Sequence, residues 1–291
     1  MSDQAICWMQ GEILPAAQAS VSVMDHGLLY GDGVFEGIRF YQNRPFRLVA
    51  HLERLVRSAR AIALPLPMTL QALTTAVQTT IDAAPWDAGY VRLVVTRGSG
   101  ALGLDPRSCR DPQVFIIADQ LQLLDRQRRH AARLVIASTR RLPADGLDPR
   151  VKSLNYLNHI LARIEANHAG VDEAILLNAQ GRIAEGTADN LFVVRDGRLL
   201  TPPVCEGALD GITRALLMDL AVQLGIPCEE IPLTPFDVHT ADECLLTGTA
   251  AELIAVAEVD GRRMGACPGP VFHALEAAFQ NLVMAEPQEA A

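Results

Sequence analysis

Residues 148–157 read DPRVKSLNYL, and this stretch contains Lys152, the only lysine in the chain. Lysine and arginine together number 25, so every other basic side chain is an arginine. A chain of this length ordinarily carries on the order of ten or more lysines. The question is what position 152 requires that an arginine does not offer.

Lys152 differs from the arginines in that its amine can lose a proton. Arginine solubilises, pairs with carboxylates and covers apolar surface, but its guanidinium stays protonated in proteins. A lysine amine becomes nucleophilic once burial or a neighbouring cation lowers its pKa. A lone lysine in an arginine-rich chain is therefore a candidate for covalent chemistry. The alternative is a chance survivor of a biased composition, and the surrounding sequence must decide.

Length, composition and charge restrict the class of protein. The 291 residues suffice for one large or two ordinary domains, and 49% apolar with 20% charged residues is typical of a globular chain. The net charge is −9, and no Lys/Arg cluster is interleaved with aromatic residues, so nucleic acid and anionic membranes are not expected partners. No apolar run approaches the roughly 18 residues that span a bilayer, and no signal peptide is visible.

Cysteine and histidine usage argues against a metal site. The six cysteines are scattered without a CxxC pair, and no two histidines have metal-ligand spacing. We therefore expect no metal and a reducing, cytoplasmic location, in which the cysteines act as small buried apolar residues.

Apolar spacing in the first part of the chain predicts an alternation of strands and helices. Apolar residues recur every three or four positions over 46–64 and again over 70–84, which predicts two amphipathic helices. β-branched residues predict strands at 90–96 and 114–118.

The polar stretch 119–130 carries no strand signal, and we place the interdomain linker there. It separates a small N-terminal domain (1–118) from a larger C-terminal domain (131–291), with Lys152 near the start of the latter. The predicted strands of the larger domain are 133–138, 173–177, 190–194 and 243–247. Its predicted helices are 156–168, 212–224 and 271–282.

A reactive lysine needs a carbonyl partner, and the most demanding candidate is pyridoxal phosphate (PLP), which is bound as a Schiff base. The phosphate of PLP needs N–H donors and a cation. Gly211–Arg214 opens a predicted helix whose N-terminus is an anion site, and Thr247–Ala251 is a small-residue turn able to aim N–H groups at an anion. Arg54, in HLERL, would supply the cation. Each feature alone is equally well explained by a helix cap, a turn or a solvated arginine.

The ring of PLP makes two further demands. Its nitrogen pairs with a carboxylate, and Glu185 in AEGTADNLF is the best candidate because a charge-assisted pair keeps that nitrogen protonated. Its phenolic oxygen needs a hydrogen-bond donor, and Tyr156 lies four residues after Lys152. A surface glutamate and a core tyrosine are the ordinary alternatives.

These features occur together and in the order of a known family. The sequence resembles the fold-type IV (class IV) PLP-dependent aminotransferases, and among them the branched-chain amino acid aminotransferases most. The resemblance covers about residues 5–280. The matching blocks are HGLLYGDGVFEGIRFY (26–41), HLERL (51–55), GYVRLVVTRG (89–98), VKSLNYLN (151–158), EGTADNLF (185–192), LDGITR (209–214) and TGTAAEL (247–253).

The resemblance implies a fold and a set of roles. The fold would be α/β (α+β), with a small α+β N-terminal domain and a larger, barrel-like α/β C-terminal domain. Lys152 would form the Schiff base and then act as general base and acid, Glu185 would pair with the pyridine nitrogen, and Tyr156 with the phenolic oxygen. Leu209 would pack against the ring. The phosphate would be held by Arg54, Ile212, Thr213 and Thr249.

Family members differ in the substrate pocket. Tyr90 and Arg92 match the Tyr-x-Arg pair of the branched-chain enzymes, whereas the Arg-x-His carboxylate trap of the D-amino acid enzymes is replaced here by Leu102-Gly103-Leu104. Losing an arginine trap removes charge-assisted hydrogen bonds of about 1.5–3 kcal/mol each, and leucines suit an apolar side chain. The residues expected to contact substrate are Tyr30, Phe35, Gly37, Arg39, Tyr90, Arg92, Leu102, Leu104, Thr249 and Ala250.

We therefore expect transamination of L-leucine, L-isoleucine and L-valine, with 2-oxoglutarate as acceptor and ping-pong kinetics. The four-residue spacing of Lys152 and Tyr156 is shared with D-amino acid aminotransferases and aminodeoxychorismate lyases. Those activities, and (R)-selective amine transamination, remain alternatives. A non-enzymatic homologue would have a damaged cofactor set, and a lysine-dependent aldolase would not need Glu185; neither fits the intact blocks.

The expected partners are small amino acids and keto acids, and a second copy of the chain. The resemblance implies at least a homodimer, because family active sites borrow a loop from the partner subunit.

Overall fold

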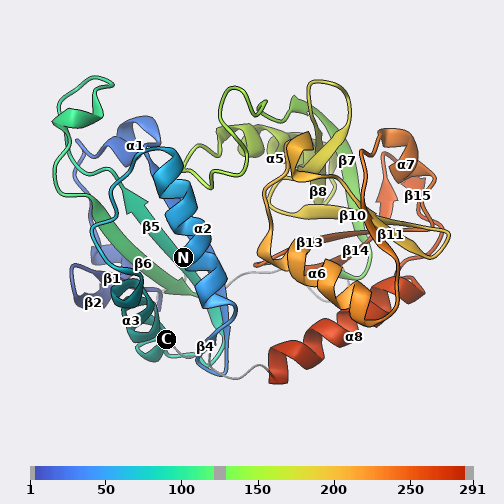
Figure 1. The fold of residues 1–291 in the computed structure, drawn as a ribbon, viewed down its shortest axis with the longest axis horizontal. Coiled ribbons are helices and arrows are strands. Elements are labelled where there is room, and N and C mark those ends of the chain that lie inside the picture. Colours follow the sequence, from blue (N-terminus) through green and yellow to red (C-terminus); the bar gives the residue numbers. More distant parts are fainter. Residues whose placement is uncertain (1–3, 121–128, 286–291) are drawn as a thin grey trace. The chain divides into compact units, whose positions relative to one another are not determined.

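The computed structural model describes residues 4–120 and 129–285, which divide into two compact units (Figure 1). The first unit contains the described residues up to 120 together with Val151–Asn155, and the second contains 129–150 and 156–284. The sequence predicts a single C-terminal domain over 131–291, whereas Val151–Asn155 belongs to the first unit, because its backbone hydrogen-bonds to the sheet of that unit. Most of the predicted linker, 121–128, lies outside the described residues.

The first unit is built on a six-stranded antiparallel sheet with the order β2-β1-β6-β5-β3-β4. One face of the sheet is apolar because alternate residues of its strands, such as Val34, Ile38 and Phe40, point the same way and are fully buried. Helices α2 and α3 cover this face. The strands are β1 (Ile6–Met9), β2 (Glu12–Pro15), β3 (Gly33–Tyr41), β4 (Arg44–Pro45), β5 (Gly89–Thr96) and β6 (Gln113–Asp119).

The predicted helices and strands of the first unit are confirmed. The helix predicted over 46–64 is α2 (Leu48–Ala61), and that over 70–84 is α3 (Leu70–Asp82). Thr69 caps α3 by accepting a hydrogen bond from the N–H of Ala72. The apolar spacing found these helices because each buries one stripe against the sheet.

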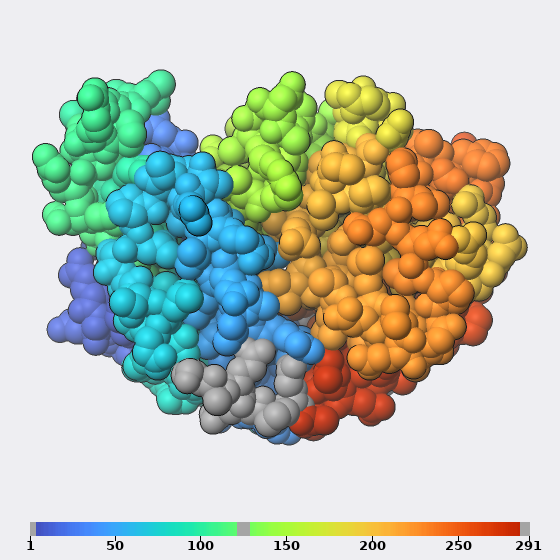
Figure 2. All heavy atoms as spheres, viewed as in Figure 1, coloured from blue at the N-terminus to red at the C-terminus, as the bar shows by residue number. Residues whose placement is uncertain are grey.

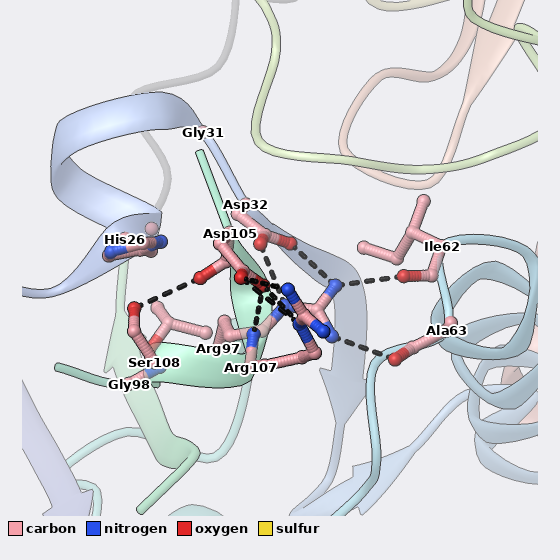
Figure 3. A network of polar contacts seen from close by, with 12 residues as sticks. His26, Gly31, Asp32, Ile62, Ala63, Arg97, Gly98, Asp105, Arg107 and Ser108 are labelled. Atoms are coloured by element: carbon pink, nitrogen blue, oxygen red, sulfur yellow. Dashed lines mark hydrogen bonds and ion pairs between the residues drawn. The ribbon is translucent and has the colours of Figure 1, made fainter. Parts of the chain in front are cut away.

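A polar network fixes the start of β3 (Figure 3). Arg97, at the end of β5, donates to both carboxylate oxygens of Asp32 at 2.7 and 2.9 Å, and to the carbonyls of Ile62 and Ala63 at 2.8 and 2.7 Å. The guanidinium thereby joins the residue before β3 to the C-terminal end of α2. Gly31, in the left-handed conformation (φ 71°), ends helix α1 (His26–Tyr30) just before this network.

The second unit is built on a nine-stranded mixed sheet that curls into a half-barrel, as the expected barrel-like domain requires. The main order is β12-β11-β10-β13-β14-β7-β8-β9, and β15 pairs with β14. The parallel pairs are β11–β12, β14–β7 and β7–β8. The strands are β7 (Ala132–Arg140), β8 (Glu173–Leu177), β9 (Ile183–Gly186), β10 (Asn190–Arg195), β11 (Arg198–Thr201), β12 (Cys228–Glu230), β13 (Glu243–Gly248), β14 (Glu252–Val259) and β15 (Arg262–Arg263).

The central strands of this sheet are covered on both faces, so their sequences read as continuous apolar runs. Every residue of β8 is buried. Ala174 and Leu176 pack with Ala162 and Ala166 of α5, whereas Ile175 belongs to the core on the other face. The helices are α5 (Leu157–Ala169), α6 (Ile212–Gln223), α7 (Pro235–His239) and α8 (Pro270–Ala285).

The helices predicted at 156–168, 212–224 and 271–282 correspond to α5, α6 and α8, and the four predicted strands of this unit are also confirmed. Within the described residues, no helix is long and apolar enough to cross a membrane. All six cysteines are free thiols. Cys7 and Cys244 are buried as expected, but Cys205 is exposed, which corrects the expectation for that residue.

Candidate active site

Lys152 lies in a short extended segment along the outer edge of β3. Its carbonyl accepts a hydrogen bond from the N–H of Phe35 at 3.0 Å, and its own N–H donates to Oγ of Ser58 on α2 at 3.1 Å. Two residues on, the N–H of Leu154 donates to the carbonyl of Gly33 at 3.0 Å. The backbone at position 152 is therefore held by both β3 and α2.

The amine of Lys152 is buried near an aromatic ring and a cation. Nζ lies 4.7 Å from the centre of the Phe35 ring. Burial, and then the nearby Arg54 guanidinium, lower the pKa of Lys152 to about 8. An ordinary lysine has a pKa of about 10.4, so a far larger fraction of Lys152 is neutral near pH 7 to 8. The structure thus supplies the property that distinguishes lysine from arginine.

Arg54 belongs to a buried charged cluster with Glu36 and His51. Nε and Nη2 of Arg54 donate to the two carboxylate oxygens of Glu36, both at 2.8 Å, and Nδ1 of His51 lies 2.7 Å from Oε2. Burial alone would raise the pKa of Glu36, but Arg54 and His51 hold it at about 2. Glu36 is therefore ionised, and two of the Arg54 donors are committed to it. The phosphate contact expected of Arg54 stays a prediction.

Sequence reasoning missed Glu36 and His51. Glu36 lies between Val34 and Ile38 on the apolar face of β3 and has no exposed surface. A charged residue at a core position of a strand is rarely buried without a partner. The position of Glu36 in the apolar pattern of β3 therefore indicates a buried partner, although it does not say which residue that is. His51 carried no such signal, because its partner is 15 residues away and on another element.

The opposite face of β3 and β5 collects five of the expected substrate residues. Phe35, Gly37 and Arg39 share this face of β3, and the register places Tyr90 and Arg92 beside them. The Arg92 guanidinium lies 4.3 Å from the Phe35 ring centre and 5.6 Å from that of Tyr90. A Cβ atom at Gly37 would lie 1.9 Å from Oη of Tyr90. Glycine is required there because the tyrosine crosses its backbone.

Tyr30, Leu102 and Leu104 form a second group of expected substrate residues. Oη of Tyr30 accepts a hydrogen bond from the N–H of Gly103 at 3.0 Å, and Nε2 of His26 lies 3.0 Å from the carbonyl of Ala101. The side chains of Leu102 and Leu104 are 74% and 81% exposed. Helix α1 thus anchors a surface loop, in green at the upper left of Figure 2, that presents two leucines to solvent.

Glu185 is buried at the end of β9 and is held from two sides. Nε of Arg141 donates to its Oε1 at 2.8 Å, and the N–H of Leu209 donates to Oε2 at 2.8 Å. Nε of Arg141 also donates to the carbonyl of Gly207 at 3.0 Å. Glu185 is a candidate from the sequence, but Arg141 is not. Arg141 lies 44 positions before Glu185, and the Arg140-Arg141 pair is typical of an exposed surface.

The remaining expected cofactor residues also lie in the second unit. Tyr156 precedes α5 and stacks on His159, with ring centres 4.5 Å apart and planes inclined by 19°. Ile212 and Thr213 begin α6, and Thr249 and Ala250 lie in the turn between β13 and β14. The predicted cofactor set is therefore divided, with Lys152 and Arg54 in the first unit and the others in the second.

The start of α6 has the chemistry that a phosphate needs. Its N-cap position is Gly211, which has no side chain to take the N–H groups of the first turn. A Cβ atom there would lie 1.9 Å from Oδ1 of Asn190, so only glycine fits. Nδ2 of the same asparagine donates to the carbonyl of Leu209 at 2.9 Å. An uncapped helix N-terminus suits an anion, and the residues present therefore fit PLP.

Comparisons with known proteins agree with this chemistry. Residues 33–259 match the family model of the amino-transferase class IV proteins. The chain is 49% identical over 255 residues, 88% of each chain, to a Methanocaldococcus jannaschii protein named provisionally as a branched-chain-amino-acid aminotransferase. It is 34% identical to the branched-chain-amino-acid aminotransferase of Pseudomonas aeruginosa, covering 97% of this chain and 94% of that one.

Solved structures show the same fold. The branched-chain aminotransferase of Thermoproteus uzoniensis with norvaline superposes with a TM-score of 0.91 at 37% identity, over 97% of this chain and 96% of that one. The branched-chain amino acid aminotransferase of Thermobaculum terrenum, in its PLP-bound holo-form, superposes with a TM-score of 0.88 at 30% identity, over 99% and 96% of the two chains.

Proposed function

This chain belongs to the amino-transferase class IV family, and from that premise we propose that it transfers the amino group of branched-chain L-amino acids to 2-oxoglutarate with PLP as cofactor. One observation carries the proposal. The only lysine of the chain has its backbone fixed on both sides and its pKa lowered to about 8. Such an amine is suited to covalent cofactor binding and to moving a proton near neutral pH.

The cofactor contacts follow the resemblance, residue by residue. Lys152 would bind the carbonyl carbon of PLP, Glu185 the ring nitrogen and Tyr156 the phenolic oxygen, while Leu209 would pack against the ring. The phosphate would be held by Arg54, Ile212, Thr213 and Thr249. The uncapped N-terminus of α6 and the two hydrogen bonds that orient Glu185 support these assignments.

Bound PLP supplies an electron sink for the charge left on the substrate Cα. The chain's own residues do the rest. As a free amine, Lys152 Nζ would take the proton from the substrate Cα, because its lowered pKa leaves part of it neutral near pH 7 to 8. The same nitrogen then returns the proton, so one residue serves as base and acid. Glu185, held by Arg141 and Leu209, keeps a fixed carboxylate facing the ring nitrogen.

The residues on the face of β3 and β5 opposite the apolar core support the choice of substrate. Arg39 and Arg92 provide cations for substrate carboxylates, and Tyr90 lies beside them. Leu102 and Leu104 offer apolar surface in place of an arginine trap, and Tyr30 holds their loop. Thr249 and Ala250 would offer backbone N–H groups to the substrate carboxylate. An apolar side chain and a carboxylate together describe leucine, isoleucine or valine.

A half-reaction tests the substrate assignment. The PLP-loaded protein is mixed, without keto acid, with L-leucine, D-alanine or (R)-phenylethylamine, and loss of the visible cofactor band is followed. We expect the band to decay fastest with L-leucine. Fast decay with D-alanine or the amine, and little with L-leucine, would assign the chain to a different activity of the same family.

The proposal includes a homodimer and a cytoplasmic location. Helix α5 exposes four aliphatic side chains at helical spacing, which is a face suited to a second copy: Leu157, Ile160, Leu161 and Ile164. The free thiols support a reducing compartment. Light scattering should give at least twice the 31.5 kDa of one chain, and Leu161→Glu should lower that mass if α5 forms the interface.

A further inference from the structure

We infer that His159 is a positioning residue that sets the direction of the Tyr156 hydroxyl through ring stacking. The inference rests on the proposed function, in which that hydroxyl bonds the phenolic oxygen of PLP. His159 belongs to none of the roles assigned above, and its place was not predicted from the sequence. Its contacts nevertheless form a continuous path from Tyr156 to the buried carboxylate of Glu173.

The first contact is the stack itself. Tyr156 precedes α5 with φ −101° and ψ 7°, and His159 lies three residues on, in the first turn of that helix. The ring planes are inclined by 19° and the ring centres lie 4.5 Å apart, which is a stacked arrangement. An aromatic pair of this kind contributes about 0.5–1.5 kcal/mol beyond area burial. The phenol plane is therefore fixed by the imidazole plane.

The imidazole plane is fixed in turn by a hydrogen bond. Nδ1 of His159 lies 2.8 Å from the carbonyl oxygen of Thr187, and the histidine is 7% exposed. Because a carbonyl only accepts, Nδ1 carries the proton and donates it. Rotation of the ring away from Tyr156 would break this bond and leave a buried carbonyl unpaired, which costs about 1–3 kcal/mol.

Thr187 is itself anchored to the buried carboxylate of Glu173. Its Oγ1 donates to Oε1 of Glu173 at 2.6 Å, and its N–H donates to the same oxygen at 3.3 Å. The other oxygen of Glu173 accepts from Nη1 of Arg163 on α5 at 2.8 Å. Strand β8, the turn after β9 and helix α5 are thus joined around one carboxylate, and His159 is the member of this network that touches Tyr156.

The direction of a phenol hydroxyl follows its ring, and hydrogen bonds weaken steeply as their angle departs from linearity. If His159 is a positioning residue, its effect on cofactor binding passes through the Tyr156 hydroxyl. This distinguishes positioning from a general effect on the fold. In a double-mutant cycle, a residue that works through Tyr156 loses its effect when the hydroxyl is removed.

The cycle consists of the wild type, His159→Ala, Tyr156→Phe and the double variant, with the dissociation constant of PLP for the apoprotein as the readout. His159→Ala should weaken PLP binding by about three- to tenfold, the range that corresponds to loss of an aromatic pair. In the Y156F background the same change should alter binding by less than about twofold. Thermal unfolding of each apoprotein reports whether the fold is retained.

Two further variants separate the stacked ring from its hydrogen bond. His159→Phe keeps a stacked ring but cannot donate to the Thr187 carbonyl, so its PLP affinity should lie between those of the wild type and His159→Ala. His168→Ala changes an exposed histidine of the same helix and should leave the dissociation constant unchanged. The wavelength of the visible cofactor band should move most in His159→Ala and less in His159→Phe.

The outcomes distinguish this inference from the function on which it rests. An equal loss of affinity from His159→Ala in both backgrounds, or no loss in either, overturns the inference while the proposed function stands. An unchanged PLP dissociation constant in Tyr156→Phe would show that the Tyr156 hydroxyl does not bond PLP, and would overturn the inference as well. A wild-type protein that does not bind PLP overturns the proposed function itself.

Discussion

Each unit of this protein contains a glutamate–arginine pair in which both side chains are buried, Glu36–Arg54 and Glu185–Arg141, and the two pairs are built differently. In the first unit, Glu36 receives both Nε and Nη2 of Arg54 and a third contact from His51. In the second, Glu185 receives Nε of Arg141 on one oxygen and the backbone N–H of Leu209 on the other. All four charged side chains are less than a tenth exposed.

The difference shows how one residue pair supports two kinds of chemistry. Burying an ion pair rarely adds stability, because desolvation offsets the attraction between the charges. In the first unit the pair fixes a cation near Lys152, and that cation contributes to the lowered pKa of the amine. In the second unit a cation and a backbone dipole orient a carboxylate toward its expected partner. In the first pair the functional group is the arginine, whose charge lowers the pKa of Lys152. In the second pair it is the glutamate, which Arg141 and the Leu209 N–H hold in place.

The largest effect is expected from Lys152→Arg. The substitution keeps the positive charge but removes the amine that loses its proton, so amino-group transfer from L-leucine should fall by at least about 10³- to 10⁴-fold. The measurement is the rate of the half-reaction. The reverse exchange at an exposed position, Arg198→Lys, is the control and should keep the wild-type rate; comparable activity in K152R would remove Lys152 from the mechanism.

Glu185→Gln tests the Glu185–Arg141 pair of the second unit. The amide keeps the shape of the side chain but loses the charge that faces the ring nitrogen, and kcat should fall by about 10²- to 10³-fold, as for the loss of one preorganised electrostatic contact. Steady-state kinetics with L-leucine and 2-oxoglutarate measure it. A Glu185→Gln variant with wild-type kcat would show that Glu185 and Arg141 form only a structural pair.

Glu36→Gln tests the other pair, and here the main effect should be on stability. Removing one member of a buried ion pair leaves Arg54 uncompensated and should lower the free energy of unfolding by about 3 kcal/mol or more. Because the pKa of Glu36 is lowered to about 2 in the fold, its contribution is present above about pH 4.5 and is lost as the pH falls toward 2. Urea unfolding at pH 7 and pH 3 should show a smaller loss at the lower pH for E36Q relative to wild type.

The smallest effect concerns the proton of Lys152. In the apoprotein, the rate at which an amine-reactive reagent labels Lys152 should rise with pH around a midpoint of about 8, because only the neutral amine reacts. Arg54→Met should move this midpoint upward, by about one pH unit, since a nearby cation disfavours the protonated amine. Arg57→Met, an exposed arginine on the same helix, is the matched control. Mass spectrometry of the labelled peptide separates Lys152 from the N-terminal amine.

The sequence indicates those candidate site residues whose chemistry and local context it displays. Lys152 is unique, Glu185 lies between two predicted strands, and Gly211-Ile212-Thr213 begins an apolar helical pattern; their roles come from the family resemblance and stay predictions. Helix and strand positions followed from the period of apolar residues. These features depend on a few consecutive residues, which a sequence displays directly.

The residues that orient the site were not predicted, because each acts through a partner far away in the sequence. Arg141 contacts a glutamate 44 residues later, and His159 contacts the carbonyl of Thr187, 28 residues later. Glu36 interrupts an apolar strand face, but only the structure shows that Arg54 and His51 are its partners. The placement of Val151–Asn155 beside β3 likewise depends on backbone hydrogen bonds that no local pattern encodes.

The central claim is that Lys152 binds the cofactor covalently, and one measurement tests it directly. The PLP-loaded protein is reduced with borohydride, digested and mapped by mass spectrometry. Because the chain has one lysine, we expect a pyridoxyl group on the peptide that contains Lys152 and on no other. A reduced protein that carries the group on its N-terminal amine, or that carries none, would show that Lys152 does not bind PLP covalently.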